Sequence, residues 1–170
     1  GTTQSTAYLN TNSTYSTPNV TLGPNGFSGS FWVFLDKTPS AQGERALLQG
    51  SWNTATGLFS YAFWGTGKGG IVIKDATNNQ KYTETADGYF ALNRWYHIAF
   101  TGDGSTLKMY IDGTLHSSVA ATLATKTSPI VLGGDSGYYF DSGYIDDVRI
   151  YNRALGANEV AEMAVPGGLL

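Results

Sequence analysis

The chain has 170 residues, which suits one domain with a sizeable core, and we expect a single domain over residues 1–170. Its formal net charge of −3 offers no basic stripe to neutralise phosphates, so nucleic acids and anionic membrane surfaces are not expected partners. Cysteine is missing, which excludes disulfides, thiolate nucleophiles and cysteine-ligated zinc, and no apolar run is long enough for membrane insertion.

Residues 1–26 are rich in Thr, Ser and Asn and hold only scattered apolar side chains. This composition predicts a polar N-terminal edge strand and loop. Strand signals become regular from Phe27 onward, with turn residues between nearly all of the apolar or alternating runs. We expect strands over Ser30–Leu35, Ala46–Gln49, Leu58–Trp64, Ile71–Lys74, Lys81–Glu84, Arg94–Thr101, Leu107–Ile111, Ile130–Gly133 and Gly143–Tyr151.

Two turn sequences indicate how these strands are paired. Gly102-Asp103-Gly104-Ser105 is expected to join two strands as a hairpin, and Asp112-Gly113 supplies the positive-φ residue that a tight reversal requires. Short strands with turns at such spacing predict an all-β fold, a two-sheet antiparallel sandwich of about a dozen strands.

One short C-terminal helix is expected over Ala157–Ala164. Glu159 lies in its first turn, where a carboxylate favours the exposed amides, although Gly156 stands where a Ser or Thr cap would be stronger. Pro and Gly then end the helix, and residues 165–170 are expected to be a tail or linker. We therefore expect this domain to be part of a larger multidomain protein.

Three motifs in order along the chain carry a family resemblance: Arg94-Trp95-Tyr96-His97-Ile98-Ala99-Phe100, Leu107-Lys108-Met109-Tyr110-Ile111-Asp112-Gly113 and the stretch from Gly143 to Leu155. Over roughly Phe27 to Met163 the chain resembles the laminin G-like (laminin G and pentraxin type) branch of the concanavalin A-like lectin/glucanase superfamily. The resemblance implies a jelly-roll sandwich and an extracellular or cell-surface location.

The same superfamily includes glucanases, whose catalytic strand carries carboxylates at alternate positions, as Glu-x-Asp closed by a second Glu. Alternation matters because residues i and i+2 of a strand point to one face, at bond-cleaving distance. No strand here has that pattern, and we expect no catalytic residues and no enzyme activity. The glutamates are Glu44, Glu84, Glu159 and Glu162.

Other residues that often carry chemistry have ordinary explanations here. His97 and His116 lack the spacing of a zinc site, and His97 is expected to be a strand residue whose ring is satisfied by a neighbour. The glycine cluster of residues 65–70 lacks the strand-to-helix setting of a phosphate-binding loop and is expected to be ordinary loop.

Calcium is the expected cofactor, in a structural role. In the sandwich modules that this chain resembles, an aspartate on a late strand often binds calcium together with backbone carbonyls from the N-terminal segment, and Asp146 is the matching position. Oxygen ligands of this kind suit Ca²⁺. The alternative is a surface Asp paired with Arg149 or Arg153, while Asp147 is a candidate for a bulged, solvent-facing position. Asp135 and Asp141 are candidates for a second calcium at the rim.

The many aromatic residues divide between core and ligand. Trp32 and Trp95 match motif positions that pack the sandwich, and we expect both in the core. Four rings at strand margins or in loops are expected to form a stacking platform for pyranose rings, with Lys68 and Asp135 as candidates for polar contacts. The alternative for each ring is that it caps the end of the sandwich. The platform candidates are Trp52, Trp64, Tyr138 and Tyr139.

Together these expectations describe a non-catalytic, lectin-like module that binds a glycan or polysaccharide and belongs to a secreted or cell-surface protein. The alternative is an adhesive or structural module that binds a surface protein or decorates a surface appendage or virion.

Overall fold

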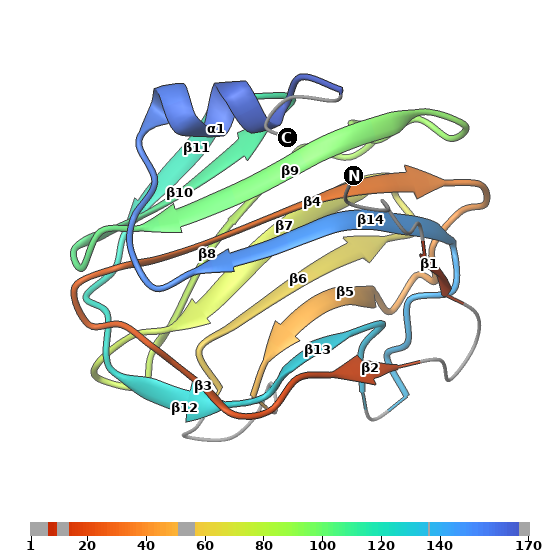
Figure 1. The fold of residues 1–170 in the computed structure, drawn as a ribbon. Coiled ribbons are helices and arrows are strands. Elements are labelled where there is room, and N and C mark those ends of the chain that lie inside the picture. Colours follow the sequence, from red (N-terminus) through yellow and green to blue (C-terminus); the bar gives the residue numbers. More distant parts are fainter. Residues whose placement is uncertain (1–6, 10–13, 51–56, 136, 167–170) are drawn as a thin grey trace, which may run out of the picture.

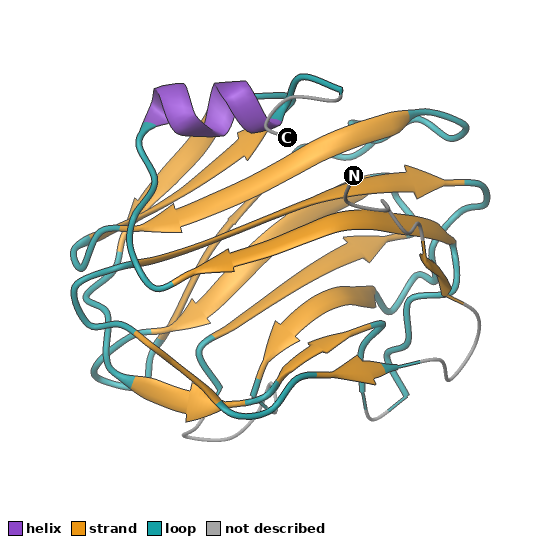
Figure 2. Cartoon of the chain, in the orientation of Figure 1, coloured by secondary structure: helices purple, strands orange, loops and turns teal. Residues whose placement is uncertain are grey.

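The computed structural model describes residues 7–9, 14–50, 57–135 and 137–166. They form two stacked six-stranded antiparallel sheets with one short helix outside them (Figures 1 and 2). The first, here called the β4 sheet, has the order β1 (Ala7–Leu9), β14 (Gly143–Tyr151), β4 (Phe27–Leu35), β9 (Trp95–Gly102), β10 (Thr106–Ile111), β11 (Thr114–Ala120).

The second sheet, called the β6 sheet, has the order β2 (Tyr15–Ser16), β13 (Ile130–Leu132), β5 (Glu44–Gln49), β6 (Phe59–Trp64), β7 (Lys68–Lys74), β8 (Gln80–Glu84). A separate pair, β3 (Val20–Leu22) with β12 (Lys126–Ser128), lies beside it. This is the predicted antiparallel sandwich.

The core lies between the sheets and is largely aromatic. Alternate residues of β4 and β6 point inward, so Phe27 and Phe31 from one sheet meet Phe59 and Tyr61 from the other. Phe27 stacks on Phe59 with ring centroids 5.6 Å apart, and Phe31 meets Tyr61 edge to face at 5.4 Å. Because side chains alternate along a strand, the remaining residues of both sheets point outward.

The predicted hairpins form. Asp103 follows β9 and its Oδ1 accepts hydrogen bonds from the amides of Ser105 and Thr106, at 3.0 and 2.8 Å. Asp112 and Gly113, with φ of 50° and 77°, join β10 to β11. Strand β11 was not expected, because its residues are mostly polar or small and exposed, and only its pairing with β10 makes it a strand.

The helix α1 (Ala157–Met163) covers part of the outer face of the β4 sheet. Val160 and Met163 pack against Ala99 and Tyr110. As predicted, Glu159 supports the first turn, accepting a hydrogen bond from the Gly156 amide at 2.8 Å. No helix among the described residues is long and apolar enough to cross a bilayer.

Three motif residues lie on the outer face of the β4 sheet. The prediction that Trp32 and Trp95 belong to the core was wrong: Trp32 is half-buried and Trp95 is 38% exposed. They alternate with Phe31 and Tyr96, and those neighbours take the inward positions. His97 is a buried strand residue that packs on Trp32 at 5.2 Å, but its Nδ1 has no hydrogen-bond partner among the described residues.

Candidate functional site: a groove on the β6 sheet

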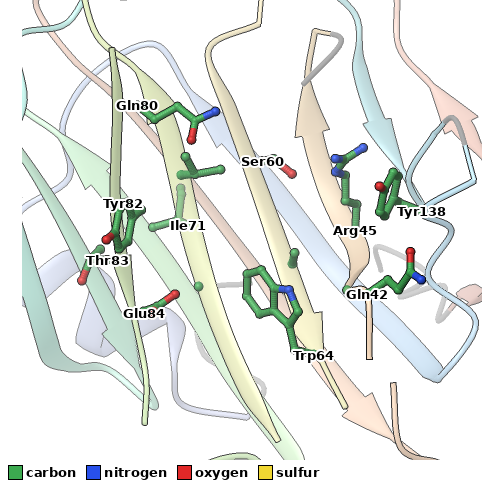
Figure 3. Close-up of a pocket in the computed structure, with 14 residues that line it drawn as sticks. Gln42, Arg45, Ser60, Trp64, Ile71, Gln80, Tyr82, Thr83, Glu84 and Tyr138 are labelled. Atoms are coloured by element: carbon green, nitrogen blue, oxygen red, sulfur yellow. The ribbon is translucent and has the colours of Figure 1, made fainter. Parts of the chain in front are cut away.

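A groove of about 360 Å³ lies on the outer face of the β6 sheet, over β5, β6, β7 and β8 (Figure 3). Three interstrand steps of about 4.8 Å separate β5 from β8, so the two walls stand roughly 14 Å apart at the backbone. One wall carries Gln42, Arg45 and Tyr138, and the other carries Gln80, Tyr82 and Glu84. Trp64, at the end of β6, stands between them.

Small residues on the two central strands make the floor. Ser60 and Ala62 of β6 and Gly70 of β7 point outward, since Phe59, Tyr61 and Phe63 take the inward positions. A Cβ on Gly70 would lie 2.7 Å from the Glu84 Cβ and 2.9 Å from the Thr83 carbonyl oxygen, so only glycine fits there. The buried Ser60 hydroxyl has no hydrogen-bond partner among the described residues.

The glycine cluster is therefore only partly loop. Gly65 and Gly67 form the turn after β6, whereas Gly69 and Gly70 lie within β7. The expectation of an ordinary loop over residues 65–70 was wrong for Lys68, Gly69 and Gly70, which belong to β7. Glycine inside a strand marks a close approach of other groups, here Phe90 to Gly69 and the β8 backbone to Gly70.

Trp64 is held from two sides. Gly43 lies so close to it that a Cβ there would be 2.7 Å from the indole Nε1. The Lys68 ammonium lies 5.2 Å from the ring centroid and pairs with Glu84 at 3.2 Å. A cation held over an aromatic ring is attracted by the ring's negative face. The indole is thus fixed in place at one end of the groove.

The wall that carries Arg45 and Tyr138 is built on a stack of these two side chains, with the guanidinium carbon 4.4 Å from the ring centroid. Arg45 Nη1 donates to Asp135 Oδ1 at 3.0 Å, and only 10% of the Arg45 side chain is exposed. Burial lowers the pKa of Arg45 from its ordinary value, and the charge of Asp135 opposes that shift. The Arg45 amide also donates to the Tyr138 carbonyl at 3.1 Å, which joins β5 to the loop that carries Tyr138.

The groove brings together two of the four predicted platform residues, Trp64 and Tyr138. Tyr139 is half-buried, bridges to Arg45 through its backbone and does not line the groove, and Trp52 lies outside the described residues. Tyr82 was not expected here, although it is 62% exposed. The sequence could have indicated Tyr82, because it is a tyrosine that shares one face of a polar strand with Gln80 and Glu84.

The three predicted calcium ligands each have a different bonding partner in the structure. Asp135 pairs with Arg45, and Asp141 pairs with Lys37 at 3.4 Å. A rim calcium at Asp135 and Asp141 stays a prediction. Asp146 Oδ1 accepts a hydrogen bond from the Asp147 amide at 2.7 Å. In the described part of the chain, no three Asp, Glu, His or Cys side chains gather as a metal site.

The bulge expected beside Asp146 is present. The pairing of β14 with β4 shifts register between Asp146 and Arg149, and Asp147 adopts a φ of 48°. The Asp147 carboxylate pairs with Arg149 at 2.7 Å. Calcium at Asp146 stays a prediction.

Comparisons with known proteins agree with this architecture. The receptor-binding domain of a botulinum neurotoxin C/D mosaic serotype superposes with a TM-score of 0.66 at 18% identity, over 83% of this chain and 36% of that one. The botulinum neurotoxin type G receptor-binding domain superposes with a TM-score of 0.67 at 17% identity, over 95% and 46%. The chain therefore spans less than half the length of these structures, and the likeness concerns the fold.

No curated protein matches the chain by sequence. A laminin G-like family model, described as the concanavalin A-like lectin/glucanases superfamily, matches residues 9–161. Because that match covers nearly the whole chain and the two-sheet sandwich is the fold it requires, the chain belongs to the concanavalin A-like lectin/glucanases superfamily, in its laminin G-like branch.

Proposed function

We propose that this chain is a non-catalytic, lectin-like module of a secreted or cell-surface protein, and that it binds a glycan in the groove of the β6 sheet. The observation that carries the proposal is the combination of an open groove, small floor residues and three aromatic side chains. Trp64, Tyr82 and Tyr138 rise around a floor that includes Ser60. Ala62 also lines the groove.

The chemistry of the groove suits a sugar. Aromatic rings stack on the apolar faces of pyranose units, while side-chain amides both donate to and accept from hydroxyl groups. Gln42 and Gln80 supply such amides on opposite walls. The volume of about 360 Å³ lies within the range typical of small-ligand sites.

A binding role without hydrolysis is favoured by the carboxylates. Among the described residues that line the groove, Glu84 is the one carboxylate, and it is paired with Lys68. Glycoside hydrolysis ordinarily requires two carboxyl groups placed on either side of the scissile bond. Incubation with polymeric glycans should accordingly release no new reducing ends.

The similar structures are named as receptor-binding domains, and that name describes those toxins. It is consistent with the proposal that this sandwich also serves recognition at a surface. We further propose that the module works as one part of a larger multidomain protein, which it would direct to glycan.

The test is retention by polysaccharides. Affinity gels and a glycan array should show binding that falls about tenfold, or about 1.4 kcal/mol, in Trp64→Ala and in Tyr82→Ala. The matched control is Trp95→Ala, which removes an exposed indole from the outer face of the β4 sheet, away from the groove. Melting temperatures of all variants show whether they are folded.

Two results would contradict the proposal. Equal loss in Trp95→Ala would mean that the groove is not the site. No retention across a broad panel would favour the adhesive or structural role, in which the module binds a protein or only decorates a larger assembly.

A further inference from the structure

We infer that the groove selects neutral glycans over acidic ones, and that Asp135 and Glu84 set this preference by forming ion pairs with Arg45 and Lys68. The inference rests on the proposed glycan binding. It adds a chemical class of ligand and two specificity-determining residues.

The two cations that contact the aromatic rings of the groove, Arg45 and Lys68, each have a carboxylate partner. Arg45 lines one wall and bonds to Asp135 at 3.0 Å, and Lys68 lies over Trp64 and bonds to Glu84 at 3.2 Å. These four charges sum to zero. A ligand beside these two pairs therefore meets dipoles and hydroxyl-binding groups, and neither pair adds a net positive charge.

The Arg45 pair is the more restrictive of the two. Its guanidinium is nearly buried, with Tyr138 against one face and Asp135 at its edge. A uronate or sulfate would have to lose its hydration and approach Asp135 in order to reach Arg45, which costs more than a new ion pair returns when the partner is already bonded. A neutral sugar hydroxyl faces no such repulsion.

The Lys68–Glu84 pair disfavours anions in the same way beside the opposite wall of the groove. Glu84 is 39% exposed, so its oxygens can still accept hydrogen bonds from sugar hydroxyls while one of them holds Lys68. An acidic sugar would instead meet the Glu84 charge before it reached the ammonium. Asp135 and Glu84 thus repel anions beside both walls of the groove.

The experiment compares one polymer in two charge states. The neutral polysaccharide that retains the protein best in the panel is used beside its own carboxymethylated derivative, so that the backbone and linkage are the same. We expect the wild type to bind the derivative about tenfold more weakly at low salt.

Two variants should relax this preference. Asp135→Asn keeps an amide oxygen for Arg45 but removes the negative charge, and Glu84→Gln does the same for Lys68. Each should bind the carboxymethylated polymer about fivefold better than the wild type at low salt, with the gain lost near 0.5 M salt because charges are then screened. Binding of the neutral polymer is measured for the same variants, and the ratio of acidic to neutral affinity should rise in both.

The control is Glu162→Gln, which removes the same charge from an exposed position on α1, on the other side of the sandwich. It should leave both affinities unchanged. Melting curves check the fold, and Glu84→Gln keeps the test decisive if Asp135→Asn is unstable, because Glu84 is exposed.

The outcomes distinguish a failure of the selectivity from a failure of the proposed glycan binding. Equal or stronger binding of the carboxymethylated polymer by the wild type would overturn the selectivity while glycan binding stands. Selectivity that persists in both variants would overturn the roles of Asp135 and Glu84. No binding to either polymer, or to any in the panel, would overturn the proposed function and this inference with it.

Discussion

Glu44, on β5, accepts a hydrogen bond at 2.9 Å from the hydroxyl of Ser142, a residue 98 positions further along the chain. The same buried carboxylate accepts from the amides of Ser40 and Asp141, at 2.7 and 3.1 Å. Glu44 thus joins the strand that carries Arg45 to the loop that carries Tyr138. The wall of the groove depends on a residue that does not line it.

Replacing Glu44 with Ala should destabilise the fold by about 3 kcal/mol, since three donors lose a buried charged acceptor. Urea unfolding measures this. Glu162→Ala, an exposed change on α1, should stay within about 0.5 kcal/mol of the wild type. Equal stability of Glu44→Ala and the wild type would show that the loop is held by other contacts.

Filling the groove should block it. Ala62→Leu places a larger side chain on the floor between the two walls, and we expect polysaccharide retention to fall about tenfold with little change in melting temperature. The matched control is Ala157→Leu, at an exposed position on α1. Undiminished retention in Ala62→Leu would place the ligand elsewhere.

Stability should fall as the pH is lowered from about 6.5 to 4. Burial lowers the pKa of His97 from 6.5 to about 4, with Asp112 opposing the shift. In that window the unfolded chain binds a proton that the folded chain does not, so acid favours unfolding by on the order of 3 kcal/mol across the window. Urea unfolding at several pH values measures the slope.

The control for the pH effect is His97→Gln, which cannot titrate in this range. Its stability should vary less between pH 6.5 and 4 than that of the wild type. Parallel slopes for the two proteins would assign the pH dependence to other groups.

Removing one buried hydroxyl should stabilise the protein. Tyr61 is fully buried, burial raises its pKa, and its hydroxyl has no hydrogen-bond partner among the described residues. Tyr61→Phe should therefore gain about 1 kcal/mol in unfolding free energy. Tyr96→Phe is the opposite case, because the Tyr96 hydroxyl accepts from the Ala91 amide at 2.9 Å, and it should lose about 1 kcal/mol. Destabilisation by Tyr61→Phe would show that the Tyr61 hydroxyl makes a stabilising hydrogen bond.

Calcium has its own test. If Asp146 holds a calcium ion in the native state, added Ca²⁺ should raise the melting temperature and a chelator should lower it, since a ligand of the folded state stabilises by RT ln(1 + [L]/Kd). Asp146→Ala should melt at one temperature with or without calcium. A wild-type melting temperature that changes neither with added Ca²⁺ nor with the chelator would contradict the predicted calcium site.

The strands of the core could be predicted because their pattern is local. Alternating apolar residues in β4, β9 and β10, with Asp and Gly at the turns, determine which side chains point inward whatever the partner strand is. Strand β11 lacks that pattern and depends on its partner. The motif positions of Trp32 and Trp95 predict core residues, but alternation along β4 and β9 puts both on the outer face.

The groove required the tertiary structure. By itself the sequence determined the sandwich, its hairpins, the C-terminal helix and the aromatic residues available for binding, since these follow from periodicity, turn chemistry and composition. Only the tertiary structure decided that Trp64, Tyr82 and Tyr138 share one surface with Gly70 beneath them. Sheet order and register bring together side chains far apart in the chain, and that pairing is a non-local choice that no single segment encodes.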